Sequence, residues 1–191
     1  MNSRDFQHLV TGGSNPFLPR LIREIDRASE IDIAVAFVKQ TGLGLLSDTL
    51  MDALERGART RILTGDYLNF TDVPGLRQLM LLQNAGADVR IFETSARQSF
   101  HLKTYIFTQF KSGEQTDGIA FVGSSNITHT ALVDGLEWNL GVRWSEDPSR
   151  FAHIRNNFDR LFTSAQTVGL THDWIDAYQK RARYAPQLVH D

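Results

Sequence analysis

Residues 100–107 read FHLKTYIF and residues 118–140 read GIAFVGSSNITHTALVDGLEWNL, and these two segments decide what the sequence predicts. Each opens with a short run of apolar, β-branched and aromatic residues, which is typical of a strand. His101 and Lys103 are two residues apart, so in an extended chain their side chains point to the same face. The spacing therefore predicts that a nucleophile or base stands beside a fixed positive charge.

The second segment adds hydrogen-bond donors and a carboxylate. Its apolar run ends in Gly123-Ser124-Ser125-Asn126, where small side chains favour a turn. Such a turn can offer backbone N–H groups, hydroxyls and an amide to an anion. Glu137 follows just inside a predicted strand at about 136–144, where a buried carboxylate needs a partner. A nucleophile, a cation, a donor-rich turn and a carboxylate together indicate chemistry on a phosphate group.

This arrangement resembles the phospholipase D superfamily, whose hallmark is H-x-K, a spacer and G-S-x-N. Those motifs read His101-Leu102-Lys103 and Gly123-Ser124-Ser125-Asn126 here. The closer resemblance is to the nuclease branch, which includes restriction endonucleases and domains fused to helicases, because Glu137 follows the Asn at that branch's spacing. One position departs from the superfamily pattern. The usual Asp on the fifth residue after the Lys is Thr108, which argues against the lipase branch.

The resemblance implies a mechanism without a metal or other cofactor. His101 attacks phosphorus to give a phosphohistidine, and a second histidine protonates the leaving oxygen. Lys103, Asn126 and the hydroxyl of Ser124 or Ser125 hold the phosphate oxygens, and Glu137 fixes the tautomer of His101. The family uses two H-x-K motifs and this sequence has one, so the resemblance implies a two-fold homodimer that completes the active site.

Each of these residues also has an ordinary structural explanation. A histidine at the start of a strand can simply be hydrogen-bonded, Lys103 can be a surface lysine, and GSSN can be a plain turn. We favour the catalytic interpretation of His101 because the other motifs accompany it. Arg97, just before the motif, is a candidate phosphate contact. The three tryptophans are interpreted as core residues rather than as platforms for bases.

The order of predicted elements indicates an α/β fold. Strands at about 31–38, 59–64 and 88–93 alternate with helices, a pattern that favours parallel pairing and right-handed crossovers. Later strands are joined mainly by loops. We therefore predict one phospholipase D-like domain over residues 1–191, with a mixed, largely parallel sheet and helices on both faces. Its core spans about 15–165 and a C-terminal helix about 171–184, and the resemblance is compatible with an N-terminal module of a longer protein.

Composition narrows the function classes. The sequence has no cysteine, which excludes disulfides, a thiolate nucleophile and a cysteine-based zinc site. The first residues lack the apolar core of a signal peptide, so we expect a cytoplasmic protein with no membrane segment. The net charge of −2 is low for a protein that coats DNA, so any basic contact surface must be local.

Three functions compete at this stage. The leading one is a metal-independent nuclease, with DNA favoured over RNA as the substrate and both left open, as a module of a restriction or helicase-linked defence system with a fused or associated helicase. The second is a nucleic-acid-binding module with weak or absent cleavage. The third is a hydrolase of lipids or other small phosphodiesters, which the lack of a basic amphipathic helix disfavours.

Overall fold

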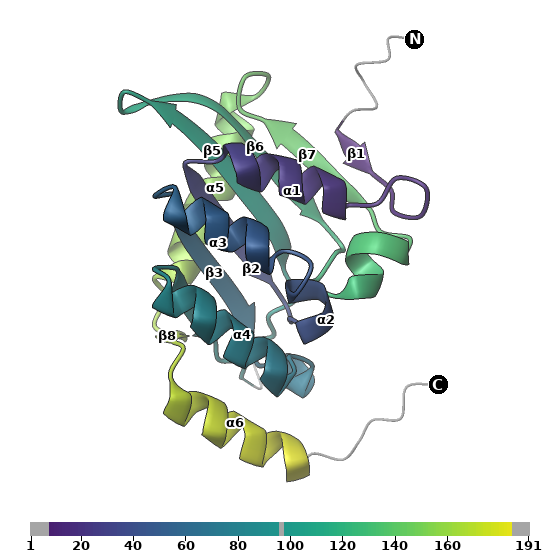
Figure 1. The fold of residues 1–191 in the computed structure, drawn as a ribbon, viewed down its shortest axis with the longest axis vertical. Helices are drawn as coiled ribbons and strands as arrows, with labels where there is room; N and C mark the ends of the chain where they lie inside the picture. The colour runs from purple at the N-terminus through teal and green to yellow at the C-terminus, as the bar shows by residue number, and fades with distance from the viewer. Residues whose placement is uncertain (1–7, 96–97, 185–191) are drawn as a thin grey trace.

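The computed structural model describes residues 8–95 and 98–184, and one eight-stranded sheet runs through them (Figure 1). The order across the sheet is β1-β7-β6-β5-β2-β3-β4-β8. The strands are β1 (Leu9–Val10), β2 (Glu30–Val35), β3 (Arg59–Gly65), β4 (Asp88–Phe92), β5 (Lys103–Lys111), β6 (Glu114–Gly123), β7 (Asn139–Arg143) and β8 (Thr167–Gly169).

The mixed α/β class is confirmed, but the expectation of a largely parallel sheet is wrong. Only β2–β3 and β3–β4 pair in parallel, and the other five pairings are antiparallel. A parallel crossover needs a connection of a dozen or more residues, usually a helix. Strands β5 and β6 are instead joined by a hairpin at Ser112 and Gly113, both with positive φ, so the chain must reverse there.

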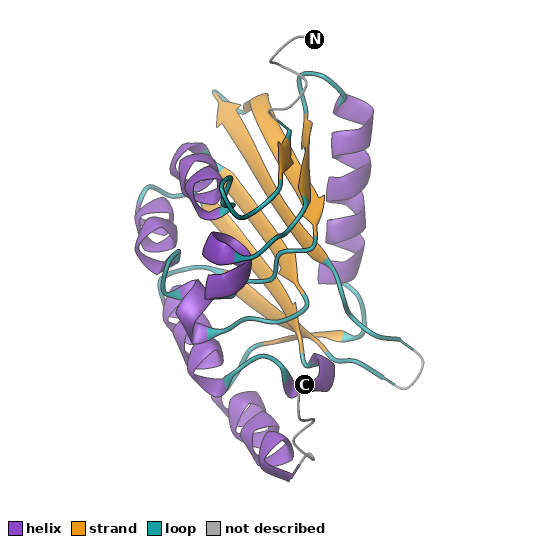
Figure 2. Cartoon of the chain, turned by 90° about the vertical axis from the view of Figure 1, so that its right-hand side faces the viewer, coloured by secondary structure: helices purple, strands orange, loops and turns teal. Residues whose placement is uncertain are grey.

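Helices cover both faces of the sheet (Figure 2). A larger core on one face includes residues of α1, α3, α4 and α6, whereas on the other face Phe151, Phe158 and Phe162 of α5 pack against residues such as Ile106 and Ala120. The helices are α1 (Leu18–Arg27), α2 (Gln40–Leu43), α3 (Ser47–Glu55), η1 (Tyr67–Asn69), α4 (Val73–Asn84), η2 (Thr130–Asp134), α5 (Pro148–Phe162) and α6 (His172–Tyr184).

Capping residues mark several helix boundaries. The Asp72 and Asp147 carboxylates accept hydrogen bonds from the backbone N–H groups of Gly75 and Arg150, which satisfies free donors in the first turns of α4 and α5. Short strand β8 was not predicted because it has only three residues and no apolar alternation.

The topology brings several strand ends to one end of the sheet. Val35, at the end of β2, pairs with Lys103, at the start of β5. Thr104 pairs with Val122 near the end of β6, and Gly123 pairs with Asn139 at the start of β7. The two sequence segments that carry the predicted chemistry therefore meet at this end.

Candidate active site

His101 and Lys103 are in direct contact at the start of β5. The Lys103 Nζ lies 2.8 Å from His101 Nδ1 and 3.2 Å from Nε2, and it donates a further hydrogen bond of 3.0 Å to the His101 carbonyl. The ring of Tyr67 meets the His101 imidazole edge-on, with 5.6 Å between centroids. The imidazole is thus positioned between an aromatic ring and an ammonium group while His101 stays exposed to solvent.

The electrostatics of this contact favour an uncharged imidazole. Although His101 is exposed overall, partial desolvation of its ring and then the nearby Lys103 ammonium lower its pKa. Geometry agrees, because an ammonium only donates and a neutral imidazole has one acceptor nitrogen, whereas an imidazolium has none. Burial lowers the pKa of Lys103 and the carboxylate of Glu137 opposes that effect. A neutral imidazole is the form that can act as a nucleophile or base, once the lone pair that accepts from Lys103 is released.

Asn126 joins this site from the loop after β6. Its side chain is 7% exposed, and its Oδ1 accepts a hydrogen bond of 3.2 Å from the backbone N–H of Phe37, just after β2. The backbone N–H of Lys39 donates to the carbonyl of Ile127 at 2.9 Å, which fixes the loop against β2. With its oxygen committed, the amide of Asn126 has its Nδ2 group left to donate to a ligand.

Ser124 and Glu137 form a second pair. The Ser124 hydroxyl donates to the Glu137 carboxylate and accepts a hydrogen bond of 3.1 Å from the backbone N–H of Trp138. The sequence had suggested that Glu137 lies just inside a strand. In the structure it lies in the loop before β7, which begins at Asn139. The hydrogen bonds of the described residues do not include one between Glu137 and His101, so the predicted role of Glu137 in fixing the tautomer stays a prediction.

Ser125 points away from the site. Its side chain is fully buried, and its hydroxyl accepts a hydrogen bond of 2.8 Å from Asn139 Nδ2. The backbone N–H groups that the turn was expected to expose are also used: Ser124 donates to the Trp138 carbonyl and Ser125 to Asn139 Oδ1. The expected phosphate contact from Ser125 therefore needs correction, because burial and internal bonding commit this residue to the turn itself.

The glycine of the GSSN turn has a steric explanation. A Cβ atom on Gly123 would lie 2.1 Å from the Trp138 carbonyl oxygen, and one on Gly12 would lie 2.0 Å from the Gly135 carbonyl oxygen. Both contacts are with backbone atoms, which cannot move aside without disturbing the fold. These two glycines let the loop that carries Glu137 approach the end of β6 and the segment after β1.

Two other positions from the sequence analysis are Arg97 and Thr108. Arg97 falls outside the described residues, so its predicted phosphate contact stays a prediction. Thr108, where the superfamily usually has Asp, is five residues beyond Lys103 on β5, about 17 Å away at roughly 3.4 Å per residue. It is buried and pairs with Glu30 and Gly118 at the far end of the sheet. The departure at this position therefore leaves the site intact.

The contacts that Asn139 and Tyr67 make in the site were not predicted from the sequence. Asn139 is fully buried and holds the GSSN turn through Ser125, and Tyr67 contacts His101 from a separate loop. Trp138, expected in the core, is 69% exposed, because its loop lies outside the strand. The signal in the sequence that could have indicated the structural role of Asn139 is its position as a polar residue within an otherwise apolar run.

Throughout the residues that the structure describes, no three or more His, Asp or Glu side chains are grouped so that they could hold a metal ion. In the same part of the chain, no helix combines the length and the apolar character needed to cross a bilayer.

Comparison with known proteins gives the following matches. Residues 21–162 match the family described as "Cardiolipin synthase, PLD-like domain". No curated protein matches the sequence.

Solved structures share the fold at low identity. NucT from Helicobacter pylori has a TM-score of 0.60 at 19% identity, covering 80% of this chain and 89% of its own. Polyphosphate kinase from Porphyromonas gingivalis has a TM-score of 0.60 at 17% identity, and the match covers 83% of this chain and 26% of the kinase. TrmBL2, an archaeal chromatin protein with a novel mode of DNA binding, has a TM-score of 0.55 at 18% identity. That match covers 88% of this chain and 57% of TrmBL2. This chain thus spans only part of the second and third proteins.

The contact between Lys103 and His101 predicts a measurable coupling. Replacing Lys103 with Met removes a positive charge that disfavours the imidazolium, so the pKa of His101 should rise. It should stay below the ordinary value of about 6.5, because burial still lowers it. Titration of the His101 ring by NMR measures this shift. Lys111→Met, a change at the exposed end of β5, is the matched control and should leave His101 unchanged. An unchanged or lowered pKa of His101 in Lys103→Met would contradict the electrostatic account.

Proposed function

We propose that this chain, which belongs to the phospholipase D-like domain family, is a metal-independent phosphodiesterase that cleaves DNA through a phosphohistidine intermediate. The observation that carries the proposal is the direct contact between the Lys103 ammonium and the ring of His101. It favours the neutral, nucleophilic form of the imidazole over the imidazolium, and it holds a cation beside the position that a phosphate oxygen would take when the nucleophile reaches phosphorus.

The reaction proceeds in two displacements. A ring nitrogen of His101 attacks phosphorus, the P–O bond to the leaving group breaks, and the leaving oxygen takes a proton from the imidazolium of His101 in a second copy of the chain. In the second step that histidine, now neutral, takes a proton from water as the water oxygen attacks phosphorus. The P–N bond breaks and His101 is regenerated. Acid–base assistance of this kind typically contributes about a hundredfold to ten-thousandfold in rate.

Three side chains stabilise the transition state. The Lys103 ammonium shifts from the imidazole to a non-bridging oxygen when phosphate binds, and the amide nitrogen of Asn126 donates to the phosphate group. The Ser124 hydroxyl, whose single proton is donated to Glu137 in the free protein, is proposed to turn that proton to the phosphate when the phosphate binds, while Glu137 sustains the positive charge of Lys103. Preorganised donors of this kind act where charge develops in the transition state.

DNA is the proposed substrate class. The NucT structure and the DNA-binding protein TrmBL2 share this fold, which supports nucleic acid as the ligand. The resemblance of the H-x-K, GSSN and Glu137 pattern to the nuclease branch supports the same choice, as well as a role as one module of a restriction or helicase-linked system. A lipid or small phosphodiester is the second candidate, and the description of the matching family as a cardiolipin synthase favours it.

A homodimer is proposed to complete the site. This sequence has one H-x-K motif, and the second histidine is proposed to come from another copy. Five large apolar side chains close to the site in sequence or register are 41–86% exposed, which is unusual for such residues when they are close together. They are Leu102, Val122, Leu136, Trp138 and Leu140. A second copy that covers them would bring the two His101 rings together around a two-fold axis.

The metal-free mechanism predicts cleavage in the presence of excess EDTA. Wild-type protein should cut plasmid or single-stranded DNA under these conditions, and His101→Ala should lose at least about a hundredfold in rate because the nucleophile is gone. Gel analysis of the products measures both. His172→Ala, at an exposed position at the start of α6, is the control and should cut normally. Cleavage that is abolished by EDTA or that survives in His101→Ala would contradict the mechanism.

The apolar surface predicts a link between assembly and activity. Leu140→Glu places a charge on a side chain that is 54% exposed in the single chain, so it should prevent dimerisation without unfolding the protein. Analytical ultracentrifugation should find a dimer for wild type and a monomer for the variant, and the variant should lose cleavage. Leu81→Glu, on α4 and 62% exposed, is the matched control. A wild-type monomer that cuts DNA at full rate would contradict the shared site.

A further inference from the structure

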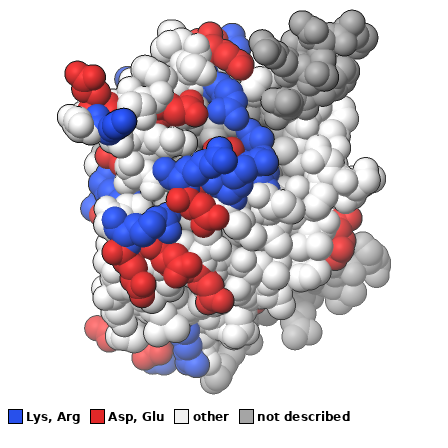
Figure 3. All heavy atoms as spheres, turned by 45° about the horizontal axis from the view of Figure 1, so that its top comes forward, with Lys and Arg blue, Asp and Glu red and all other residues white. Residues whose placement is uncertain are grey.

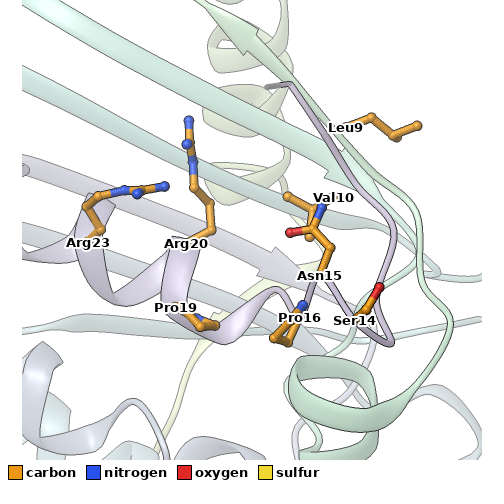
Figure 4. Close-up of a pocket in the computed structure, with 8 residues that line it drawn as sticks. All are labelled: Leu9, Val10, Ser14, Asn15, Pro16, Pro19, Arg20 and Arg23. Atoms are coloured by element: carbon orange, nitrogen blue, oxygen red, sulfur yellow. The ribbon is translucent and has the colours of Figure 1, made fainter. Parts of the chain in front are cut away.

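A cavity of about 520 Å³ lies away from His101, between α1 and the segment that joins β1 to α1 (Figure 4). Its polar lining comes from Ser14, Asn15, Arg20 and Arg23. Arg20 and Arg23 both extend from α1, and Asn15 faces them from the segment before the helix (Figure 4). The cavity is thus lined by two guanidinium groups, a hydroxyl and an amide. None of these groups takes part in the mechanism proposed above.

The guanidinium of Arg20 is only partly satisfied. Its side chain is 15% exposed, and its Nε forms an ion pair with Glu24 Oε1 at 3.1 Å. Its Nη2 is buried and has no hydrogen-bond partner among the described residues. A buried donor of a charged group without an acceptor is costly. Because Nη2 is shielded from solvent, an acceptor in the cavity would satisfy it once the Arg20 side chain turns toward the cavity. Arg20 also lies over the ring of Phe121, 5.6 Å from its centroid, which holds it in place.

The surroundings of Arg20 are positively charged despite the net negative chain. Burial lowers the pKa of Arg20, Glu24 opposes this, and the guanidinium groups of Arg23, Arg143 and Arg27 lower it further. The side chain of Arg23 is 49% exposed, and its Nε is 4.0 Å from the same Glu24 oxygen. Figure 3 shows Lys and Arg side chains gathered in a band on the end of the molecule that it views, with several carboxylates beside them. Arg143 forms an ion pair of 3.6 Å with Asp117. Arg20 and Arg23 instead share the same oxygen of Glu24, so these two guanidinium groups can take a further anion.

We propose that this cavity is a second phosphate subsite, in which Arg20 and Arg23 hold a backbone phosphate of the nucleic acid whose scissile phosphate lies at His101. This assignment rests on the proposed function, because it takes the same polymer as ligand. Guanidinium groups suit it, since they bind phosphate oxygens through paired N–H donors. The subsite adds affinity and register without reading the base sequence.

The position of the cavity is compatible with one strand reaching both sites. Phe121, which Arg20 covers, is three residues before Ser124, so the two positions are about 10 Å apart at roughly 3.4 Å per residue. A DNA strand advances about 3.4 Å per nucleotide along a duplex, so roughly three nucleotides span this separation. Local contacts of this kind also explain how a chain with a net charge of −2 can hold DNA.

The test measures DNA binding without turnover. All proteins carry His101→Ala, and the probe is a short fluorescein-labelled oligonucleotide, single- or double-stranded, titrated by anisotropy over a series of salt concentrations. Arg23→Gln removes one charge, and Arg20→Lys keeps the charge but loses the planar fork. Arg150→Gln is the matched control, at a side chain 68% exposed in the first turn of α5 on the other face of the sheet. Urea unfolding of each variant accompanies the titrations.

The expected result is weaker binding by Arg23→Gln and Arg20→Lys, with Arg150→Gln equal to its parent. In Arg23→Gln the slope of log affinity against log salt should become shallower by about 0.7 for single strands or about 0.9 for duplex, the loss of one phosphate contact. Equal affinities and slopes for all variants would overturn the subsite. Weakening with an unchanged slope in a destabilised Arg23→Gln would also overturn it, because that pattern indicates a structural role. Since binding needs no turnover, failure of the cleavage assay would count against the proposed function and not against this comparison.

Discussion

The antiparallel insertion of β5 beside β2 is the constraint on which the site depends. Pairing of Val35 with Lys103 sets the lysine at the end of the sheet, and the same end receives the loop after β6. Asn126 then reaches the backbone of Phe37 just after β2. A shift of β5 by one residue would turn Lys103 to the opposite face, because side chains alternate along a strand. Because His101 stands two residues before Lys103 on the same face, the two side chains would turn together, so the register of the two central strands decides whether this pair lies on the same face as the rest of the site.

Local spacing predicted the parts of the site that depend on few residues. The two-residue step from His101 to Lys103 indicated a shared face, and the structure has the two side chains in contact. Ser125 and Glu137 were harder to place, because their environment depends on Asn139 and Trp138 across the β6–β7 pairing. Sequence periodicity carries no information on which of two adjacent serines turns inward.

The fold, like the site, could be predicted only in the parts that depend on local sequence. Alternating strands and helices before residue 93 indicated the parallel pairs β2–β3 and β3–β4, because such pairs need crossovers. The place where β5 inserts could not be predicted from the chain, since β5 pairs with β2 rather than with β4, the strand before it. The sequence placed Trp138 and Leu140 in an apolar strand, which suggests burial, but both are exposed. Apolar character alone does not tell whether a side chain is buried within one chain or left on its surface.

The most direct test of the account is to trap the covalent intermediate. DNA cleavage is stopped early in alkali, which preserves phosphohistidine, and the peptides are analysed by mass spectrometry. The account predicts a nucleotidyl phosphate adduct on the peptide that contains His101, formed during turnover and absent from the His101→Ala protein. Turnover without any adduct on His101, together with inversion of configuration at phosphorus, would contradict it, because that result means direct attack by water.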